Sequence, residues 1–527
     1  MKAKYITIVK GISLSIALSI LSSCMGDLDR VPFIEVTSAT VFKDPANYKP
    51  LLAKLYAGLA VSGQQGPAGK PDISGIDEGF STYLRQYFKA QELPTDEAVI
   101  GWNDGSLPSY HTMTWTSGNE FITAMYNRIY YQIGICNEYI RETSDEKLAS
   151  RGITSPEIKM YRAEARFLRA LSYYHALDMF GSVPFVTEKD AVGSFLPKQI
   201  SKADLFTYIE SELKAIEVDM AEPRKNEYAR ADKAAAWTLL TKLYLNAEVY
   251  INAGKYTEAI TSAKKVIGAG YVIESKYQNL FLADNNKSAE IIFPIAFDGT
   301  KTKTWGGMTF MVHAPVGGKM NPAEFGINGG WGGLRTTQQF VDHFDDKSGK
   351  TDSRAMFFTD GQNKEVADIS AFTDGYAITK YKNVTSTGVK GSDSEGNFPD
   401  TDFPMFRLAD VYLMYAEAVL RGGSGGDLTT ALQYVNALRA RAYNGAQGNV
   451  TLLNLDLIIK ERGRELYWEC HRRTDLIRFK MFTGTSYVWA WKGGTKAGAG
   501  VSDNMKLFPI PSYDIVANPN LVQNTGY

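Results

Sequence analysis

Apolar residues recur at helical spacing over several long stretches of the chain. This spacing predicts one helix over 156–180, which Gly181 ends, and another over 202–221. The stripe residues are Tyr161, Ala165, Leu168 and Tyr174 in the first segment and Leu205, Ile209, Leu213 and Ile216 in the second. The pattern therefore indicates amphipathic helices that bury one face each.

Two further stretches have the pattern of paired helices. Residues 231–250 predict one helix and residues 256–267 a second, with a turn at Gly254 between them, at the spacing of a tetratricopeptide unit. A similar pair occupies residues 407–441. A generic helical hairpin explains one such unit equally well, but two matching units favour a helical-repeat scaffold.

Long irregular stretches separate the helical parts. Residues 62–118 are rich in Gly, Pro, Asp and Trp, residues 296–335 hold a cluster of glycines, and residues 383–402 are polar. Irregular stretches of this length inside a compact domain usually carry function. We therefore expect a binding site in the loops, roughly within 62–118 and 270–405.

The N-terminus has the features of an export signal. Three lysines precede the short apolar segment 11–21, and small residues then lead to Cys24. Because this segment is too short to span a bilayer, we predict a signal peptide over 1–23, with Cys24 as the lipidated first residue of the mature protein. Plain secretion with an incidental cysteine is the alternative. Lipidation would make the lipid anchor the only membrane attachment.

Composition and motifs exclude several classes of function. The 527 residues carry 57 basic and 58 acidic side chains, a balance that does not suggest a nucleic-acid binder. Besides Cys24 there are two cysteines, which is too few for a disulfide framework. No zinc-ligand spacing, phosphate loop or dinucleotide motif occurs. Asp96 and Glu97 are adjacent, and neighbouring carboxylates seldom face each other across a glycosidic bond. We predict that the protein is not an enzyme; a carboxylate pair from distant segments is the alternative.

Long motifs in the C-terminal part resemble the signature of the SusD/RagB family, the surface glycan-binding lipoproteins of Bacteroidetes. They are FPMFRLADVYLMYAEAVL (403–420), ERGRELYWECHRRTDLIRF (461–479) and LFPIPSYDIVANPNLVQNTGY (507–527), and further similar segments lie at 77–97, 167–185 and 230–247. The resemblance covers essentially the whole mature chain and is greatest to the starch-binding members.

The resemblance implies a fold and a role. The fold is mostly α, with four tetratricopeptide-type helix pairs and long irregular loops, and residues 24–527 form a single domain. The implied role is non-catalytic binding of starch-like α-glucans, or malto-oligosaccharides, at the cell surface. The implied partner is a TonB-dependent outer-membrane transporter of the SusC type, to which the glucan is delivered.

Charged residues crowd the segment 461–475. They are Glu461, Arg464, Glu465, Arg472, Arg473 and Asp475. We interpret them as a solvated or ion-paired helix face and not as a site.

Three tryptophans in the glycine-rich loops are the candidate sugar platforms: Trp102, Trp305 and Trp331. A flat aromatic ring stacks on the apolar face of a sugar, while charged or amide groups bind its hydroxyls. Taken singly, each tryptophan is explained equally well by packing.

The resemblance assigns roles at this site. It implies an arc of Trp102, Trp305 and Trp331. It also implies that Asp77 and Arg85 bind hydroxyls, and that Asn103 or Asp104 serves where the family has an asparagine. Ile100 stands where the starch-binding relative has a further tryptophan, so one platform is lost.

Four residues form a candidate calcium site. Asp400 and Asp402 lie in one loop, and Asp284 and Asn286 in another. Hard oxygen ligands suit calcium, although an isolated D-x-D is usually only a loop cap. The resemblance implies a structural Ca²⁺ in this region, and Asn286 in place of an acidic residue weakens the match.

Other functions remain open at this point. One is a related binder of a different glycan, which the loss of a ring at Ile100 motivates. Another is a scaffold whose helical repeats bind protein and whose tryptophans are structural.

Overall fold

The computed structural model describes residues 38–193 and 195–527. The chain divides into two compact units, of which the first ends at Asn47 and the second begins at Tyr48. The described part of the first unit contains helix α2 (Ser38–Val41) and a 3-10 turn.

The predicted export signal lies outside the described residues. This holds for the signal peptide over 1–23 and for Cys24. The prediction that residues 24–527 form a single domain therefore stays a prediction.

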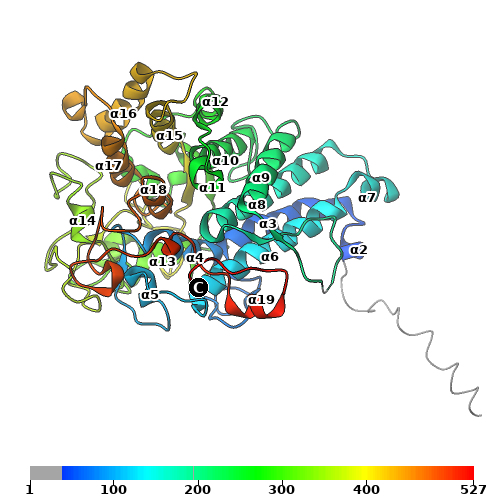
Figure 1. Ribbon diagram of the computed structural model, residues 1–527, viewed down its shortest axis with the longest axis horizontal. Coiled ribbons are helices and arrows are strands. Elements are labelled where there is room, and N and C mark those ends of the chain that lie inside the picture. The colour runs from blue at the N-terminus through cyan, green and yellow to red at the C-terminus, as the bar shows by residue number, and fades with distance from the viewer. Residues whose placement is uncertain (1–37, 194) are drawn as a thin grey trace, which may run out of the picture. The chain divides into compact units, whose positions relative to one another are not determined.

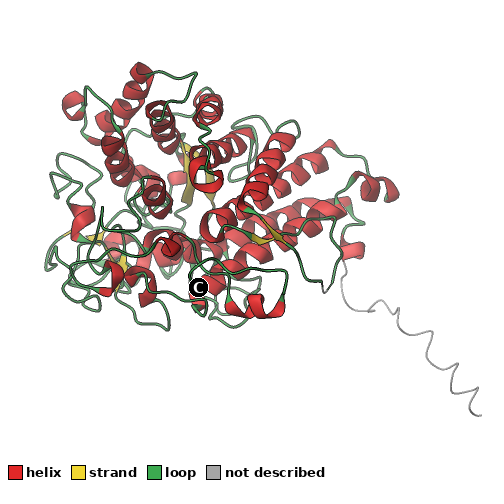
Figure 2. Ribbon diagram, viewed as in Figure 1, coloured by secondary structure: helices red, strands yellow, loops and turns green. Residues whose placement is uncertain are grey.

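Helices dominate the second unit, which confirms the mostly α fold class (Figures 1 and 2). The helices are α3 (Tyr48–Ala60), α4 (Tyr83–Glu92), α5 (Pro108–Thr112), α6 (Glu120–Glu142), α7 (Asp145–Ser150), α8 (Pro156–Phe180), α9 (Lys202–Ile216), α10 (Lys233–Leu245), α11 (Ala247–Ile251), α12 (Tyr256–Ile267), α13 (Gly307–His313), α14 (Gln338–Val341), α15 (Leu408–Leu420), α16 (Leu428–Ala442), α17 (Leu455–Leu466), α18 (Arg472–Arg478) and α19 (Ser512–Ala517).

Short strands pair in antiparallel couples. The couples are β1 (Val99–Ile100) with β5 (Leu334–Arg335), β2 (Val183–Pro184) with β3 (Gln199–Ile200), β4 (Ile291–Ile295) with β8 (Phe403–Arg407), and β6 (Phe357–Phe358) with β7 (Ala377–Ile378). All residues of β4 and β8 are buried, so this couple belongs to the core.

Helix α8 matches its predicted bounds, whereas α9 is shorter than expected. Proline is well suited to the first turn of a helix, and Pro156 starts α8; Gly181, at φ 75°, ends it. Helix α9 ends at Ile216 and not at residue 221. Residues 217–219 continue as turns, with Asp219 N and Met220 N both donating to Ile216 O.

The predicted helix over 231–250 is interrupted at Asn246, which separates α10 from α11. The Asn246 side chain donates a 2.8 Å hydrogen bond to the carbonyl of Lys242, which competes with continuation of the helix. At the other end, the Asp232 side chain accepts hydrogen bonds from Ala234 N and Ala235 N and caps α10.

The long helices pack in succession across the second unit (Figure 1). Helix α6 packs on α8, α8 on α9, α10 on α12, α12 on α15, and α15 on α16. This stack is compatible with the predicted tetratricopeptide-type pairs, whose number of four stays a prediction. Loops predominate around α5, α13 and α14, where the candidate tryptophans lie (Figure 2).

The charged segment 461–475 is buried and ion-paired, so the ion-paired interpretation is correct and the solvated one is wrong. At the end of β8, Arg407 Nη1 lies 2.8 Å from Glu290 Oε1 and 2.7 Å from Glu465 Oε1. Its Nε lies 2.6 Å from Glu469 Oε2. Partners from distant segments thus neutralise charges that would be costly to bury alone.

Two further observations concern the predicted compartment. Cys136 and Cys470 are both buried free thiols, so they form no disulfide. Over residues 38–193 and 195–527, no helix has the length and apolar character needed to cross a membrane.

Candidate functional site

A two-stranded ladder brings together two tryptophans that are far apart in sequence. Trp102 follows β1, Trp331 precedes β5, and the strands pair so that Gly101 N donates a 3.0 Å hydrogen bond to Gly333 O. The ring centroids of Trp102 and Trp331 lie 6.3 Å apart, with their planes tilted by 46°. Both side chains are half-buried, so part of each ring is open to solvent. We call these two residues the tryptophan pair.

His313, at the end of α13, packs against Trp331. Its ring stacks on Trp331 at 5.0 Å with 25° between the planes, and its carbonyl accepts a 2.9 Å hydrogen bond from Trp331 N. The two imidazole nitrogens lie 2.7 Å from Gly329 O and 2.9 Å from Asn397 O. Burial lowers the pKa of His313, and these two hydrogen bonds oppose that shift. The histidine thereby ties the loop of Trp331 to a second loop.

Trp102 is held by close contact with backbone and with another ring. Phe310 on α13 approaches it edge-on at 6.1 Å. A Cβ added at Gly333 would lie only 2.4 Å from Trp102 Cε2. Only a glycine therefore leaves room for the indole at this place.

Arg85 on α4 lies beside the tryptophan pair and connects it to Trp305. Its Nη1 donates to Gly79 O at 3.0 Å and to Trp305 O at 3.3 Å. Its guanidinium lies 5.9 Å from the ring of Trp102. Burial lowers the pKa of Arg85 to about 9, while the negative charges of Asp77 and Asp104 oppose this change.

Aromatic rings surround the guanidinium on other sides as well. Arg85 lies 4.2 Å from the centre of the Phe80 ring and 4.4 Å from that of Phe310. Cations over aromatic faces are stabilised by the ring quadrupole. One turn along α4, the buried Lys89 ammonium lies 4.0 Å from the Phe121 ring, and burial holds its pKa well below the ordinary value.

The other predicted residues lie around this centre. Asp77 is exposed and accepts a 2.9 Å hydrogen bond from Gly79 N. Trp305 is half-buried and packs on Phe398 at 4.9 Å. Asn103 and Asp104 are exposed on the turn after Trp102, and their side chains have no hydrogen-bond partner among the described residues. The structure therefore joins Trp102, Trp331 and Arg85 directly, and Trp305 and Asp77 through Gly79 and Arg85.

Ile100 is 2% exposed and pairs with Leu334 within the β1–β5 ladder. It presents no surface to a ligand, so the open aromatic surface at this ladder is that of the tryptophan pair.

Sequence reasoning missed three supporting residues: His313, Phe310 and Gly333. Their roles depend on packing between loops that are distant in sequence. Only Gly333 gave a signal, as a member of the glycine cluster in 296–335.

The predicted calcium ligands do not assemble into a cage. Among the described residues, no three His, Cys, Asp or Glu side chains form a group that could hold a metal ion. Asp402 is buried and accepts from Phe297 N at 2.7 Å and from the Tyr228 hydroxyl, and burial raises its pKa to about 6. A buried carboxylate with a raised pKa and internal hydrogen-bond partners is a poor ligand for a hard cation.

The remaining members of that set also have internal partners or lie apart. Asp400 accepts a 2.7 Å hydrogen bond from Gly299 N and a 2.6 Å bond from Ser392 N. Asp284 accepts a 2.7 Å bond from Ser386 N. Asn286 is exposed. These residues do not fit a calcium site in this arrangement.

The adjacent carboxylates of Asp96 and Glu97 serve the interior. Asp96 forms a two-pronged ion pair with Arg472, both contacts at 2.7 Å. Glu97 accepts a 3.1 Å hydrogen bond from Trp468 N. Both residues are buried, so neither faces a substrate.

Two family models match the chain. One, described as "Starch-binding associating with outer membrane", matches residues 35–245. The other, described as the SusD family, matches residues 358–527.

Curated relatives match over long stretches. The starch-binding protein SusD of Bacteroides thetaiotaomicron is 37% identical over the full length of both chains. SusD-like protein P2 of Formosa agariphila is 26% identical over 82% of this chain and 86% of its own length.

Solved structures share the fold. Surface glycan-binding protein A from Bacteroides fluxus superposes with a TM-score of 0.70 at 19% identity, covering 92% of this chain and all of that one. The surface glycan-binding protein A from Bacteroides thetaiotaomicron, in complex with laminarihexaose, gives 0.68 at 20% identity, covering 91% and 99%. The predicted resemblance and the predicted fold class are thus confirmed. The SusD relative and both solved structures are named as starch-binding or glycan-binding proteins, in agreement with the prediction of a non-catalytic protein.

Proposed function

This chain belongs to the SusD family of glycan-binding proteins, and from that premise we propose that it binds starch-like α-glucans without cleaving them. The observation that carries this proposal is the tryptophan pair, two half-open rings 6.3 Å apart and tilted by 46°. Two rings whose planes differ by 46° can stack on sugar units that differ in orientation, as successive units of a curved α-glucan do. Each ring stacks on the apolar face of one sugar unit.

Polar groups beside the pair support this proposal. Asp77 supplies an exposed carboxylate. Arg85 beside it is only 4% exposed and already donates to Gly79 O and Trp305 O, so only its remaining donors, at the edge of the site, would serve a sugar. Asn103 and Asp104 have side chains free for a ligand. Charge-assisted hydrogen bonds of this kind are stronger than neutral ones and fix the orientation of each sugar. Trp305, half-buried against Phe398, would add a third ring to the site.

The glucan would then pass to a transporter. We infer a partner of the SusC type in the outer membrane and anchoring at the cell surface through a lipidated Cys24. The name of the family model, which mentions association with the outer membrane, supports the location. Co-purification of the transporter with the tagged protein from outer membranes tests the partnership, and its absence there would contradict it.

Native affinity electrophoresis tests the binding. Gels contain amylopectin, pullulan, dextran or no glycan, and Trp331→Ala and Trp102→Ala run beside the wild type. Trp237→Ala is the matched control, because Trp237 is a half-buried tryptophan on α10, outside the site. We expect amylopectin to retard the wild type and the control, and each site variant to lose roughly fivefold in affinity for one lost stacking contact of about 1 kcal/mol. Retardation by dextran alone would instead favour a differently linked glucan. The replacement of a tryptophan by the buried Ile100 would then be the first explanation to test.

A further inference from the structure

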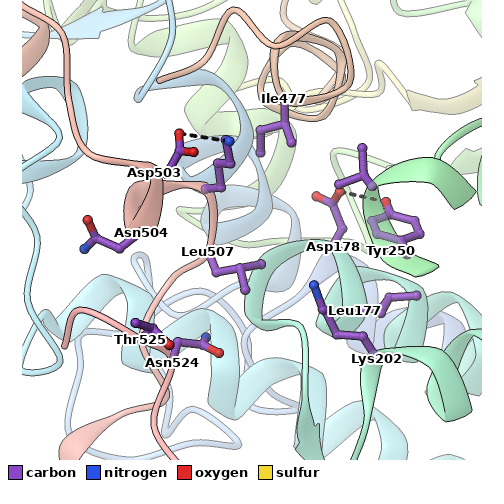
Figure 3. A pocket seen from close by; sticks show the side chains of 12 residues that line it. Leu177, Asp178, Lys202, Tyr250, Ile477, Asp503, Asn504, Leu507, Asn524 and Thr525 are labelled. Carbon is purple, nitrogen blue, oxygen red and sulfur yellow. Dashed lines mark hydrogen bonds and ion pairs between the residues drawn. The ribbon is translucent and has the colours of Figure 1, made fainter. Parts of the chain in front are cut away.

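A separate cleft of about 540 Å³ lies in the second unit, away from the tryptophan pair (Figure 3). The end of α8, helices α11 and α18, and the C-terminal segment form its walls. Its volume falls within the range of small-ligand sites, about 300–1,000 Å³. None of its lining residues belongs to the site described above.

One wall presents a fixed hydrogen-bond acceptor. Asp178 is held by Gln91 at 2.8 Å, Thr474 at 3.0 Å and Arg473 at 3.0 Å, all through Oδ2. Its Oδ1 accepts one bond, from the Tyr250 hydroxyl at 2.8 Å. Because a carboxylate oxygen accepts two hydrogen bonds, Oδ1 has capacity for a further donor from a ligand. The carboxylate is therefore oriented before any ligand arrives.

Two donors in the cleft lack partners. Figure 3 shows the Lys202 ammonium pointing into the cleft, and it forms no hydrogen bond or ion pair with any described residue. The side-chain amide of Asn504 on another wall is likewise without a partner among the described residues. Both side chains are partly exposed, so water satisfies them until a ligand replaces it.

The rest of the lining mixes apolar and polar side chains. Leu177, Leu507 and Ile477 supply its apolar part, and Asn524 and Thr525 add polar groups. Asp178 pairs with Arg473 at 3.0 Å and Asp503 with Lys506 at 2.9 Å, so Lys202 is the charged group of the lining without an ion pair among the described residues. Its ammonium can donate hydrogen bonds to the oxygens of a neutral polyol. A purely apolar ligand would bury the Lys202 ammonium without compensation.

We propose that this cleft is a second saccharide site, which takes the end of a short neutral malto-oligosaccharide. A sugar has both the hydroxyl donors and acceptors that Asp178, Lys202 and Asn504 require and the apolar C–H faces that suit the leucines. The sugar class rests on the proposed function, whereas the existence of a site for a neutral polyol rests on the cleft alone. The tryptophan pair would hold the body of the chain, and the cleft would hold a short fragment or a chain end.

Maltotriose binding, followed by saturation-transfer NMR and titration, tests this site. The starting protein carries Trp102→Ala and Trp331→Ala, so that the tryptophan pair no longer contributes. Lys202→Ala with Asn504→Ala is then added. Neither of these side chains has a partner among the residues that the structure describes, so we expect the fold to be retained. Lys225→Ala is the control, since Lys225 is an exposed lysine outside the cleft and also without a partner among the described residues.

We expect the starting protein to retain maltotriose binding and the cleft variants to weaken it at least roughly tenfold, because charge-assisted hydrogen bonds are lost. Lys225→Ala should change nothing. Absence of maltotriose binding in the starting protein, or binding unaffected by the cleft variants, would overturn the proposal.

Amylopectin gels separate this inference from the proposed function. The cleft variants in the wild-type background should keep amylopectin retardation within about twofold, since the tryptophan pair is intact. If amylopectin failed to retard the wild type while Lys202-dependent maltotriose binding persisted, the function proposed for the tryptophan pair would be refuted. The cleft would then remain supported as a saccharide site.

Discussion

Gly333 controls the position of Trp102, and a single methyl group there should weaken glucan binding without touching the ligand surface. In Gly333→Ala the new Cβ would lie 2.4 Å from Cε2, 2.5 Å from Cζ2 and 2.8 Å from Nε1 of the indole. Carbon atoms in ordinary contact are separated by about 3.5–4.0 Å. The ring must therefore move by about 1 Å or more.

This displacement changes the angle and spacing of the tryptophan pair. The stacking contribution of one ring, about 1 kcal/mol, corresponds to roughly a fivefold loss of affinity. The backbone hydrogen bonds of Gly333, to Ala314 O and from Gly101 N, do not involve its side chain and can persist. Stability should thus fall less than affinity.

Isothermal titration with maltoheptaose measures the effect, and tryptophan fluorescence reports the moved indole. The matched control is Gly329→Ala in the same loop, where a Cβ meets no atom within 4 Å. We expect Gly329→Ala to bind like the wild type. Equal affinities for Gly333→Ala and Gly329→Ala would refute the claim that Trp102 must stand where it does.

Three further predictions concern stability and location. Glu465→Gln removes the charge that faces Arg407 and Arg441 in the interior. We expect the free energy of unfolding to fall by about 3 kcal/mol, which lowers the Tm by about 3 °C for a unit of this size. An unchanged Tm in calorimetry would contradict this. Burial raises the pKa of Glu92 to about 7 and that of Glu97 well above its ordinary value, so the stability they contribute at low pH is lost as the pH rises from about 4.5 through 7. Thermal melts from about pH 5 to 8 should therefore show a smaller decline for Glu97→Gln than for the wild type, and parallel declines would argue against this assignment. Palmitate labelling in a bacterial host should disappear in Cys24→Ala; labelling that persists would exclude that anchor.

The sequence predicts helices well where local signals act at both ends. Pro156 and Gly181 bound α8 at the residues expected. The predicted helix over 231–250 is broken because the Asn246 side chain binds the carbonyl of Lys242 and also accepts from Arg478, which is distant in sequence. The spacing of apolar residues along the chain carries no information about that contact.

In the candidate site, too, single residues could be predicted from the sequence, whereas their arrangement in space could not. Tryptophans in glycine-rich loops could be selected from the sequence as candidate platforms, and family resemblance selected Arg85 and Asp77. Their proximity depends on the β1–β5 couple, whose strands have two residues each and no alternation to detect. The stacking of His313 on Trp331 likewise arises only when two loops meet.

Burial of charge was also beyond sequence reasoning. Glu465 is predicted as part of a charged helix face, yet it is buried because Arg407 and Arg354 come from distant segments to neutralise it. The sequence likewise carried no sign that the candidate calcium ligand Asp402 accepts hydrogen bonds from Phe297 N and Tyr228, which come from other parts of the chain.

A crystal structure of the protein with maltoheptaose tests the central claim most directly. The account predicts glucose rings stacked on Trp102 and Trp331, with hydroxyls within hydrogen-bond distance of Arg85 or Asp77. Sugar density that avoids both rings, in crystals where their faces are open to solvent, would contradict it.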